Sequence, residues 1–310
     1  MTTANTNVTG TSGFPNAIAI HYSTQLLDWL KADLMLDQFG QMKKLPKNKG
    51  NQIYFTRYTP FTADTNALSE GVTPDGQELQ SAQIDATPVQ YGNYCTMSDF
   101  LQMETIDPVI ESANELLAYQ AALSLDTIIR NTLHSNVTNQ FANGQSQETD
   151  VAAVMTATEI RKAVYTLKKN KVKRIKGDFV AVIDPAQSHD LQGETATGAW
   201  LDLNKYTTNG PLYKGEIGKM YGARLVETHN AGNGVGAEAV ATYRAFMFGD
   251  GAYGLVELAG ANLEMIAKQL GSEGSGDPLN QRSSVGYKFS HVTKVLDANR
   301  AIEIYTASNV

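Results

Sequence analysis

Hydrophobic residues recur at helical or strand spacing in several parts of the chain, and polar stretches separate these parts. From Asn16 to Phe39, apolar side chains recur mostly every three or four residues between charged ones, which predicts an amphipathic helix. Gln52 to Tyr58 (QIYFTRY) and Thr87 to Met97 (TPVQYGNYCTM) are rich in aromatic and β-branched residues and predict strands. We interpret the unit from Gln52 to Met97 as one long hairpin that carries an extended excursion.

The excursion, Phe61 to Ala86, is polar throughout and is called the acidic stretch below. It contains five acidic residues, no Lys or Arg, and the turn signal Pro74-Asp75-Gly76. Burial within a monomer would contribute little to such a segment, and a long loop in a compact domain is usually functional or disordered. We therefore expect the acidic stretch to contact another molecule.

The strongest local pattern predicts one long helix from Asp107 to His134. Asp107 suits the N-cap, Pro108 suits the first helical position, and apolar residues follow at three- and four-residue steps. A helix of about 27 residues, at 1.5 Å each, is roughly 40 Å long. Its wide apolar face implies packing against a sheet or other helices.

A second region of mixed helix and strand follows the Asn-, Gln- and Gly-rich segment Ser135 to Asp150, which we predict to be a loop and a domain boundary. Thr156 and Glu159 form a capping-box pattern before an apolar helix. Asp178 to Asp184 (DFVAVID) predicts a buried strand. Further strands are predicted at Ala223–Thr228, Ala245–Phe248, Val285–Leu296 and Ala301–Tyr305.

The last two strands flank an Asp297-Ala298-Asn299 turn and predict a C-terminal β-hairpin. Helices and strands do not alternate regularly, and no repeat at a fixed period is present. These patterns predict an α+β fold in place of a doubly wound sheet.

Composition narrows the class of protein. The 310 residues, 42% of them hydrophobic, suffice for one large core or two smaller ones. The single cysteine, Cys95, excludes an intrachain disulfide. No apolar stretch reaches the roughly 18 residues of a membrane helix, and Met1 to Gly13 lacks a secretory pattern, so we expect synthesis in the cytosol without membrane contact. A net charge of −7 argues against nucleic-acid binding by the whole surface but suits an acidic container around DNA.

Candidate sites of chemistry have a structural interpretation in each case. Gly232 to Gly236 matches neither GxxxxGK[ST] nor GxGxxG and is read as a turn. The histidines His189, His229 and His291 stand alone, without ligand spacing. Asp107 and Asp184 suit caps and strand ends better than paired acid–base catalysis, and neither GxSxG nor SxxK occurs. We predict no catalytic, cofactor-binding or metal-binding residue.

The strongest charge feature is the basic run from Lys168 to Lys176 (KKNKVKRIK), which follows a predicted helix. A solvated helix end is one interpretation. The other is a partner contact, either with the acidic stretch of a neighbouring subunit or with packaged DNA. The basic side chains are Lys168, Lys169, Lys171, Lys173, Arg174 and Lys176.

Several stretches, taken together, resemble the major capsid proteins of tailed phages with the Hong Kong 97-type fold, most closely the coliphage N-four coat protein family. The resemblance covers most of the chain after residue 40, in order and at similar spacing. The stretches include LPKNKGNQIYFTRY from Leu45, LSEGVTPDG from Leu68, QYGNYCTMS from Gln90, DTIIRNTL from Asp126 and GDPLNQRSSVG from Gly276.

The resemblance implies an N-terminal arm at 1–50, an E-loop with its flanking strands at 51–98, a peripheral P-domain with a spine helix at 99–150, an axial A-domain at 151–270 and a return to the P-domain at 271–310. It implies that the E-loop, which is the acidic stretch, contacts neighbouring subunits. The residues expected there are Glu70, Pro74, Asp75, Gly76 and Glu78. Lysine-mediated E-loop crosslinking is not expected, because the stretch contains no Lys.

The function that the resemblance implies is structural. Subunits would assemble through hexamers and pentamers into an icosahedral shell around double-stranded phage DNA, held without sequence specificity, in the host cytoplasm. Portal, scaffold and decoration proteins are further partners left open. The alternative is an encapsulin-like nanocompartment shell, which shares the fold but encloses protein cargo.

Overall fold

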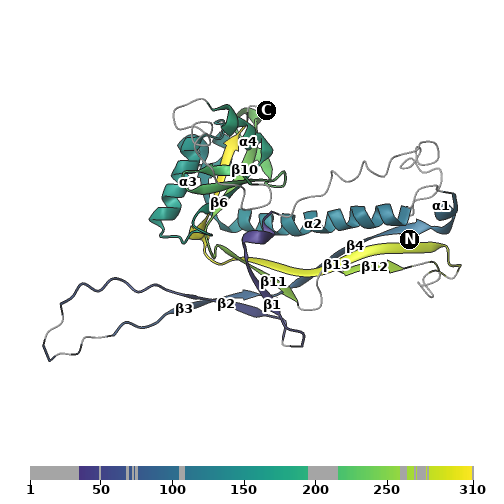
Figure 1. The fold of residues 1–310 in the computed structure, drawn as a ribbon, viewed down its shortest axis with the longest axis horizontal. Helices are drawn as coiled ribbons and strands as arrows, with labels where there is room; N and C mark the ends of the chain where they lie inside the picture. Colours follow the sequence, from purple (N-terminus) through teal and green to yellow (C-terminus); the bar gives the residue numbers. More distant parts are fainter. Residues whose placement is uncertain are drawn as a thin grey trace.

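The computed structural model describes residues 35–48, 50–67, 70–71, 73, 76–104, 109–194, 216–258, 264–268, 270, 277 and 279–308. These residues form a body around a seven-stranded sheet, an elongated part around a five-stranded sheet and a long helix, and a two-stranded hairpin that projects away from both (Figure 1).

The seven-stranded sheet has the order β5-β14-β10-β6-β8-β7, with β9 paired to β10. It is mixed, because β6 pairs parallel to β8 and β14 parallel to β5, while the other pairs are antiparallel. The strands are β5 Thr138–Phe141, β6 Phe179–Ile183, β7 Glu216–Met220, β8 Ala223–Glu227, β9 Asn233–Val235, β10 Ala241–Phe248 and β14 Ala301–Ala307.

Helices cover both faces of this sheet, so its strands are apolar at successive positions. Alternate residues of a strand point to opposite faces. Ala181 of β6 packs with α3 (Ala157–Lys169), whereas Val180 and Val182 pack with the end of α2 (Val109–Asn136). All five residues of β6 are buried. Helix α4 (Pro185–Gly193) follows β6, and short 3-10 turns lie at Ala142–Gly144, Glu148–Asp150, Ala237–Ala239 and Ala298–Arg300.

The elongated part is organised by the 14-residue strand β13. The sheet order is β1-β11-β13-β12, and β4 pairs with the opposite side of β13. Helix α2 extends from the body along this sheet (Figure 1), where Leu117 and Ala121 pack against Val285 and Tyr287. The remaining elements are η2 Asp37–Phe39, β1 Gln41–Leu45, β4 Val89–Ser98, α1 Asp99–Glu104, β11 Tyr253–Leu258, β12 Glu264–Lys268 and β13 Arg282–Val295.

The strands and helices predicted from the pattern are confirmed where the structure describes them. The two segments of the predicted hairpin unit are β2 (Ile53–Tyr58) and β4, the buried strand is β6, and the four further strands are β8, β10, β13 and β14. The predicted long helix is α2. Its caps Asp107 and Pro108, and most of the predicted helix from Asn16 to Phe39, lie outside the described residues.

The strand pairing differs from the prediction at both hairpins. β2 pairs with β3 (Ser81–Ala86), the end of the acidic stretch, and not with β4, which pairs with β13. The predicted C-terminal hairpin is wrong, because β13 and β14 lie in different sheets. Each strand therefore joins the partner that buries its apolar side, and Ala86 of β3 becomes fully buried although its stretch is polar overall.

Two local predictions are also corrected. The segment predicted as a loop, Ser135 to Asp150, contains β5, which adds to the body sheet through β14. Thr156 is the N-cap of α3 as predicted, but its side chain makes no capping bond. Glu159 instead accepts hydrogen bonds from Gln140 Nε2 at 2.8 Å and Asn143 N at 3.2 Å. The capping-box carboxylate is thus used for a tertiary contact.

The chain passes from one sheet to the other more than once, so each sheet contains strands from separate parts of the sequence. β11 and β12 belong to the five-stranded sheet although they lie within 151–270, and β14 belongs to the body although it lies within 271–310. Sequence-continuous ranges therefore do not describe the two spatial parts.

Candidate assembly surfaces

The most exposed element is the hairpin of β2 and β3. Its strands pair from Ile53 with Ala86 to Tyr58 with Ser81, and Thr59 N donates to Gln80 O at 3.0 Å. The described residues beyond this pair, towards the tip, belong to no strand. Figure 1 shows the hairpin extending far from the body. It thus presents a long surface that the described residues of its own chain leave uncovered.

The predicted contact residues lie on this extension. Glu70, Gly76 and Glu78 are exposed, while Pro74 and Asp75 lie outside the described residues. Large apolar side chains accompany them: Tyr58, Phe61 and Leu79 are 59%, 58% and 60% exposed. Sequence reasoning missed these apolar side chains because acidic and polar neighbours dominate the composition of the stretch. Such side chains are available for burial by a partner.

The root of the hairpin is fixed by packing. Phe55 and Ala86 are buried with Leu45 and Val256. The Phe55 ring lies directly over Gly254, where a Cβ would come within 2.5 Å of the ring. A side chain larger than that of glycine would collide with the ring at this position. The ring therefore packs directly on the backbone of β11 and anchors β2 on the five-stranded sheet.

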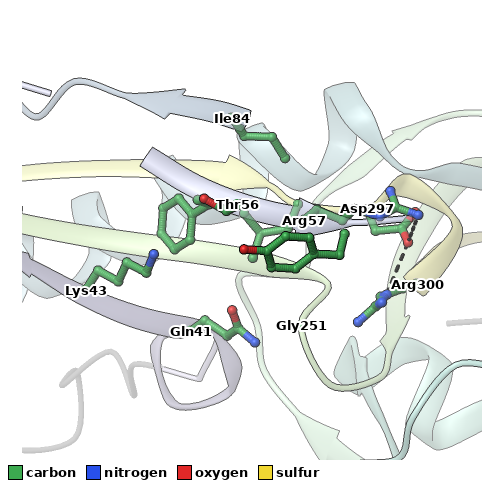
Figure 2. A pocket seen from close by; sticks show the side chains of 11 residues that line it. Gln41, Lys43, Thr56, Arg57, Ile84, Gly251, Asp297 and Arg300 are labelled. Carbon is green, nitrogen blue, oxygen red and sulfur yellow. Dashed lines mark hydrogen bonds and ion pairs between the residues drawn. The ribbon is translucent and has the colours of Figure 1, made fainter. Parts of the chain in front are cut away.

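A cluster of charged side chains also holds the root (Figure 2). Arg57 of β2 pairs with Asp297 at 2.7 Å, and Arg300 Nε lies 3.1 Å from the same carboxylate oxygen. Asp297 lies in the segment that carries the chain from β13 to β14, and its other oxygen accepts a hydrogen bond from Asn299 N. The hairpin is therefore tied to the connection between the two sheets.

All six side chains of the basic run are exposed, as the solvated interpretation and the partner interpretation both require. Lys168 and Lys169 lie in the last turn of α3, where a positive charge complements the helix dipole. Lys173 pairs with Asp250 at 3.2 Å, and Arg174 lies over the Phe179 ring. The run forms a basic surface on the body, and Lys173 and Arg174 also contact other residues of the same chain.

Large apolar side chains are also exposed on the elongated part, on both β4 and the helices α1 and α2. Tyr94 of β4 is 71% exposed and Met103 of α1 is 78% exposed. Phe100 and Leu116 are also more than half exposed. Alternation in QYGNYCTM predicted the strand but could not reveal that only one face of the sheet is covered by a helix.

A buried polar cluster joins the end of α2 to the body sheet. Glu303 is fully buried, and its Oε1 lies 2.9 Å from His134 Nδ1. Tyr305 donates its hydroxyl to Glu303 Oε2 at 3.0 Å, and Arg244 Nε lies 3.8 Å from Oε1. Burial raises the pKa of Glu303, and the contacts with His134 and Tyr305 act in the opposite direction. We interpret this cluster as a structural joint.

The other candidate residues have structural positions. The predicted turn at Gly232–Gly236 includes the short strand β9, and Glu148 and Val151 pack closely on it. Asp184 caps α4 by accepting from Ala186 N at 2.9 Å, within a capping box formed with Gln187. His291 is buried, with Nε2 2.8 Å from Thr293 Oγ1, and burial lowers its pKa to about 4.

Among the described residues, no group of three or more His, Cys, Asp or Glu side chains is placed to hold a metal ion. None of the helices in that part of the chain is long and apolar enough to span a bilayer.

The sequence model of a family described as "Phage capsid protein" matches residues 81–304. The chain belongs to the phage capsid protein family. The match covers most of the chain, including the elongated part and the body, and starts at the first residue of β3. This phage capsid protein is a component of a virion shell.

Solved capsids have the same fold. The capsid of Ralstonia phage GP4 matches with a TM-score of 0.74 at 14% identity, over 98% of this chain and 99% of that chain. The capsid of cyanophage P-SCSP1u matches with a TM-score of 0.67 at 16% identity, over 94% and 93%. A structure from Mycobacterium phage Che8 matches with 0.61 at 16% identity, over 94% and 98%.

A search of curated proteins finds no match to this phage capsid protein. At the identities above, the solved structures establish the fold, which combines mixed sheets with few helices. The family match assigns the chain to phage capsids and does not favour the alternative of an encapsulin-like compartment.

Proposed function

We propose that this major capsid protein assembles through hexamers and pentamers into an icosahedral shell that encloses double-stranded phage DNA. The single observation that carries the proposal is the projecting β2–β3 hairpin, together with the family match. A hairpin that its own body leaves uncovered is typical of an element that is stabilised by a neighbour.

We assign the parts of the fold by the Hong Kong 97-type scheme. The hairpin with its acidic stretch is the E-loop, α2 is the spine helix, and the five-stranded sheet with α2 is the P-domain. The seven-stranded body is the A-domain, and residues 1–50 form the N-terminal arm. The elongated α2 packed along β13 and the compact body beside it support this division.

In this proposal the E-loop contacts a neighbouring subunit through Glu70, Pro74, Asp75, Gly76 and Glu78. The exposed Phe61 and Leu79 support it, since burial of apolar surface contributes roughly 25 cal/mol per Å². Each contact needs to be only moderately favourable, because heterologous contacts that close into rings are repeated around the shell.

The basic run has one of two roles in the shell, contact with a neighbour's acidic E-loop or an inner surface facing DNA. Reversal of Lys168, Lys169 and Lys171 to Glu is expected to weaken assembly at low salt if the first role holds. Shell yield measured by sedimentation at several salt concentrations tests this role, and an unchanged yield at low salt would exclude it.

The proposed role is mechanical and not catalytic, with no cofactor. The shell would enclose DNA without recognising its sequence. Its net negative charge repels the DNA phosphates and so limits adhesion of the shell to its contents. Assembly would take place in the host cytoplasm, and portal, scaffold and decoration proteins are candidate partners.

The experiment that tests the proposal is negative-stain electron microscopy of the purified protein, with size-exclusion chromatography at several salt concentrations. Closed shells, or stable pentamers and hexamers, are expected. DNA inside native particles would identify a virus shell. A small closed dimer with a deep pocket would contradict the proposal.

A further inference from the structure

A cavity of 250 Å³ lies at the root of the β2–β3 hairpin. Figure 2 shows the residues around it, which include Gln41 and Lys43 of β1, Arg57 of β2, Ile84 of β3, Gly251, and Asp297 and Arg300 from the segment between β13 and β14. The cavity is far larger than the space of one water molecule and admits a polar side chain.

The charges around the cavity are unbalanced. Three cations, Lys43, Arg57 and Arg300, line it with a single carboxylate, Asp297. Asp297 is only 8% exposed and is already shared between the two guanidinium groups. The two arginines remain 45% and 38% exposed. Arg300 Nη1 donates to Asp250 O at 3.1 Å, but the five N–H donors of each guanidinium exceed the bonds it makes within the chain. An anion entering here would meet an excess of positive charge.

Gly251 keeps the space in front of these donors open. Its φ is +71°, which favours glycine, and a Cβ there would lie 3.0 Å from Arg300 Nη1 and 3.2 Å from Gln41 Nε2. Any larger residue would crowd both donors and strain the loop. The arginine and the amide thus converge on a space that a glycine leaves empty.

We propose that this cavity is an anion-binding site that receives a carboxylate side chain from a second copy of the chain. The inference rests on the proposed function and names a receiving site on the neighbouring subunit. Guanidinium groups bind carboxylates through charge-assisted and often paired hydrogen bonds.

The chain itself supplies suitable carboxylates. The acidic stretch contains no Lys or Arg. Its four described carboxylates, Asp64, Glu70, Glu78 and Asp85, are all exposed, and none pairs with a described cation of the same chain. Glu70 and Glu78 lie towards the tip of the hairpin, where a neighbour is reached most easily, and are the first candidates.

The test uses the full-length chain assembled without nucleic acid, with shell yield measured by sedimentation and electron microscopy. Gln41→Glu places a negative charge in the cavity without removing any intramolecular ion pair. Gln281→Glu makes the same charge change at another exposed position. The thermal unfolding midpoint of each variant establishes that it is folded.

Gln41→Glu is expected to lower shell yield about tenfold, because the incoming carboxylate is repelled, while Gln281→Glu stays within about twofold of wild type. Combining Gln41→Glu with Glu70→Gln or Glu78→Gln should restore yield in at least one pair.

The carboxylate site would be overturned if the two single variants gave equal yields, or if neither double variant restored the yield. In either case, shells formed by the wild-type chain would still uphold the proposed function. An effect seen only when DNA is packaged would make phosphate the ligand and also overturn it. Failure of the wild-type chain to form shells or capsomers would overturn the function and this inference together.

Discussion

The two sheets of this protein differ in how much of their surface the chain covers for itself. Strand β6 of the seven-stranded sheet is buried at every position, because α3 and the end of α2 cover opposite faces. Strand β4 of the five-stranded sheet is exposed at six of its ten positions. A helix covers that sheet on one face, where Leu117 meets Val285.

This difference distinguishes the residues that stabilise the fold of one subunit from the residues that remain available for contact between subunits. The body stabilises itself by burying large apolar side chains on both faces of a sheet. The elongated part and the hairpin leave Tyr94, Leu79 and Phe61 exposed, and in the proposed shell a neighbouring subunit would cover such apolar surface. Substitutions in the body should therefore change stability, and substitutions in the extension should change assembly.

The largest effect is expected in the body. Leu225→Ala removes a fully buried side chain from β8 and should reduce the free energy of unfolding by about 3 kcal/mol. Urea unfolding followed by circular dichroism measures it. If Leu225→Ala reduced the free energy of unfolding no more than substitution of an exposed side chain does, the contrast between the body and the exposed extension would be contradicted.

The next effect concerns the joint between α2 and the body. Glu303→Gln replaces a buried carboxylate that contacts His134 and Tyr305, and should destabilise the protein by about 2 kcal/mol. Glu264→Gln is the matched control, because Glu264 is 57% exposed and its pair with Lys288 should contribute less than about 1 kcal/mol. Equal losses in urea unfolding would remove the distinction between a buried joint and a surface pair.

His291 predicts an acid-labile step in the elongated part. Its folded pKa of about 4 is below its ordinary value of 6.5, so neutral His291 is favoured in the fold and the unfolded chain binds the proton first. Stability is therefore fully present above pH 6.5 and falls as the pH drops towards 4, by about 2 kcal/mol at pH 5. His291→Gln should remove this part of the pH dependence of unfolding. An identical pH profile for the variant would contradict the assignment.

The smallest effect on stability is expected at the exposed surface. Tyr94→Ser should change the free energy of unfolding by less than about 0.5 kcal/mol, since the side chain is 71% exposed, yet it should lower shell yield. Parallel unfolding and sedimentation measurements compare the two quantities. Normal shell yield would show that this surface lies outside the subunit contacts.

The elements were largely predictable, whereas their pairing was not. Local patterns were sufficient for β6 and α2, because a continuous apolar run and helical spacing are encoded in neighbouring residues. The partners of β2, β4 and β14 depend on contacts between residues distant in sequence, which no local pattern contains. Between His291 of β13 and Glu303 of β14 the chain changes sheets without any signal in composition beyond the turn at Asp297.

The candidate surfaces were predictable in part. Charge alone located the acidic stretch and the basic run. The cavity at the hairpin root was not foreseen, because Gln41, Arg57, Gly251 and Arg300 come from four separate segments. Its signal is the convergence of cations in space, which requires the fold.

The most direct test of the central claim replaces residues 60–79 by a two-residue Asn-Gly turn, which suits a tight hairpin closed by the Thr59–Gln80 pair at the ends of β2 and β3. Hydrogen exchange and sedimentation would be measured on the same protein. We predict unchanged protection of β6, β8 and β10 and loss of closed shells. Normal shells from the shortened protein would contradict the assignment of the hairpin to assembly, and loss of protection in the body would contradict its independence.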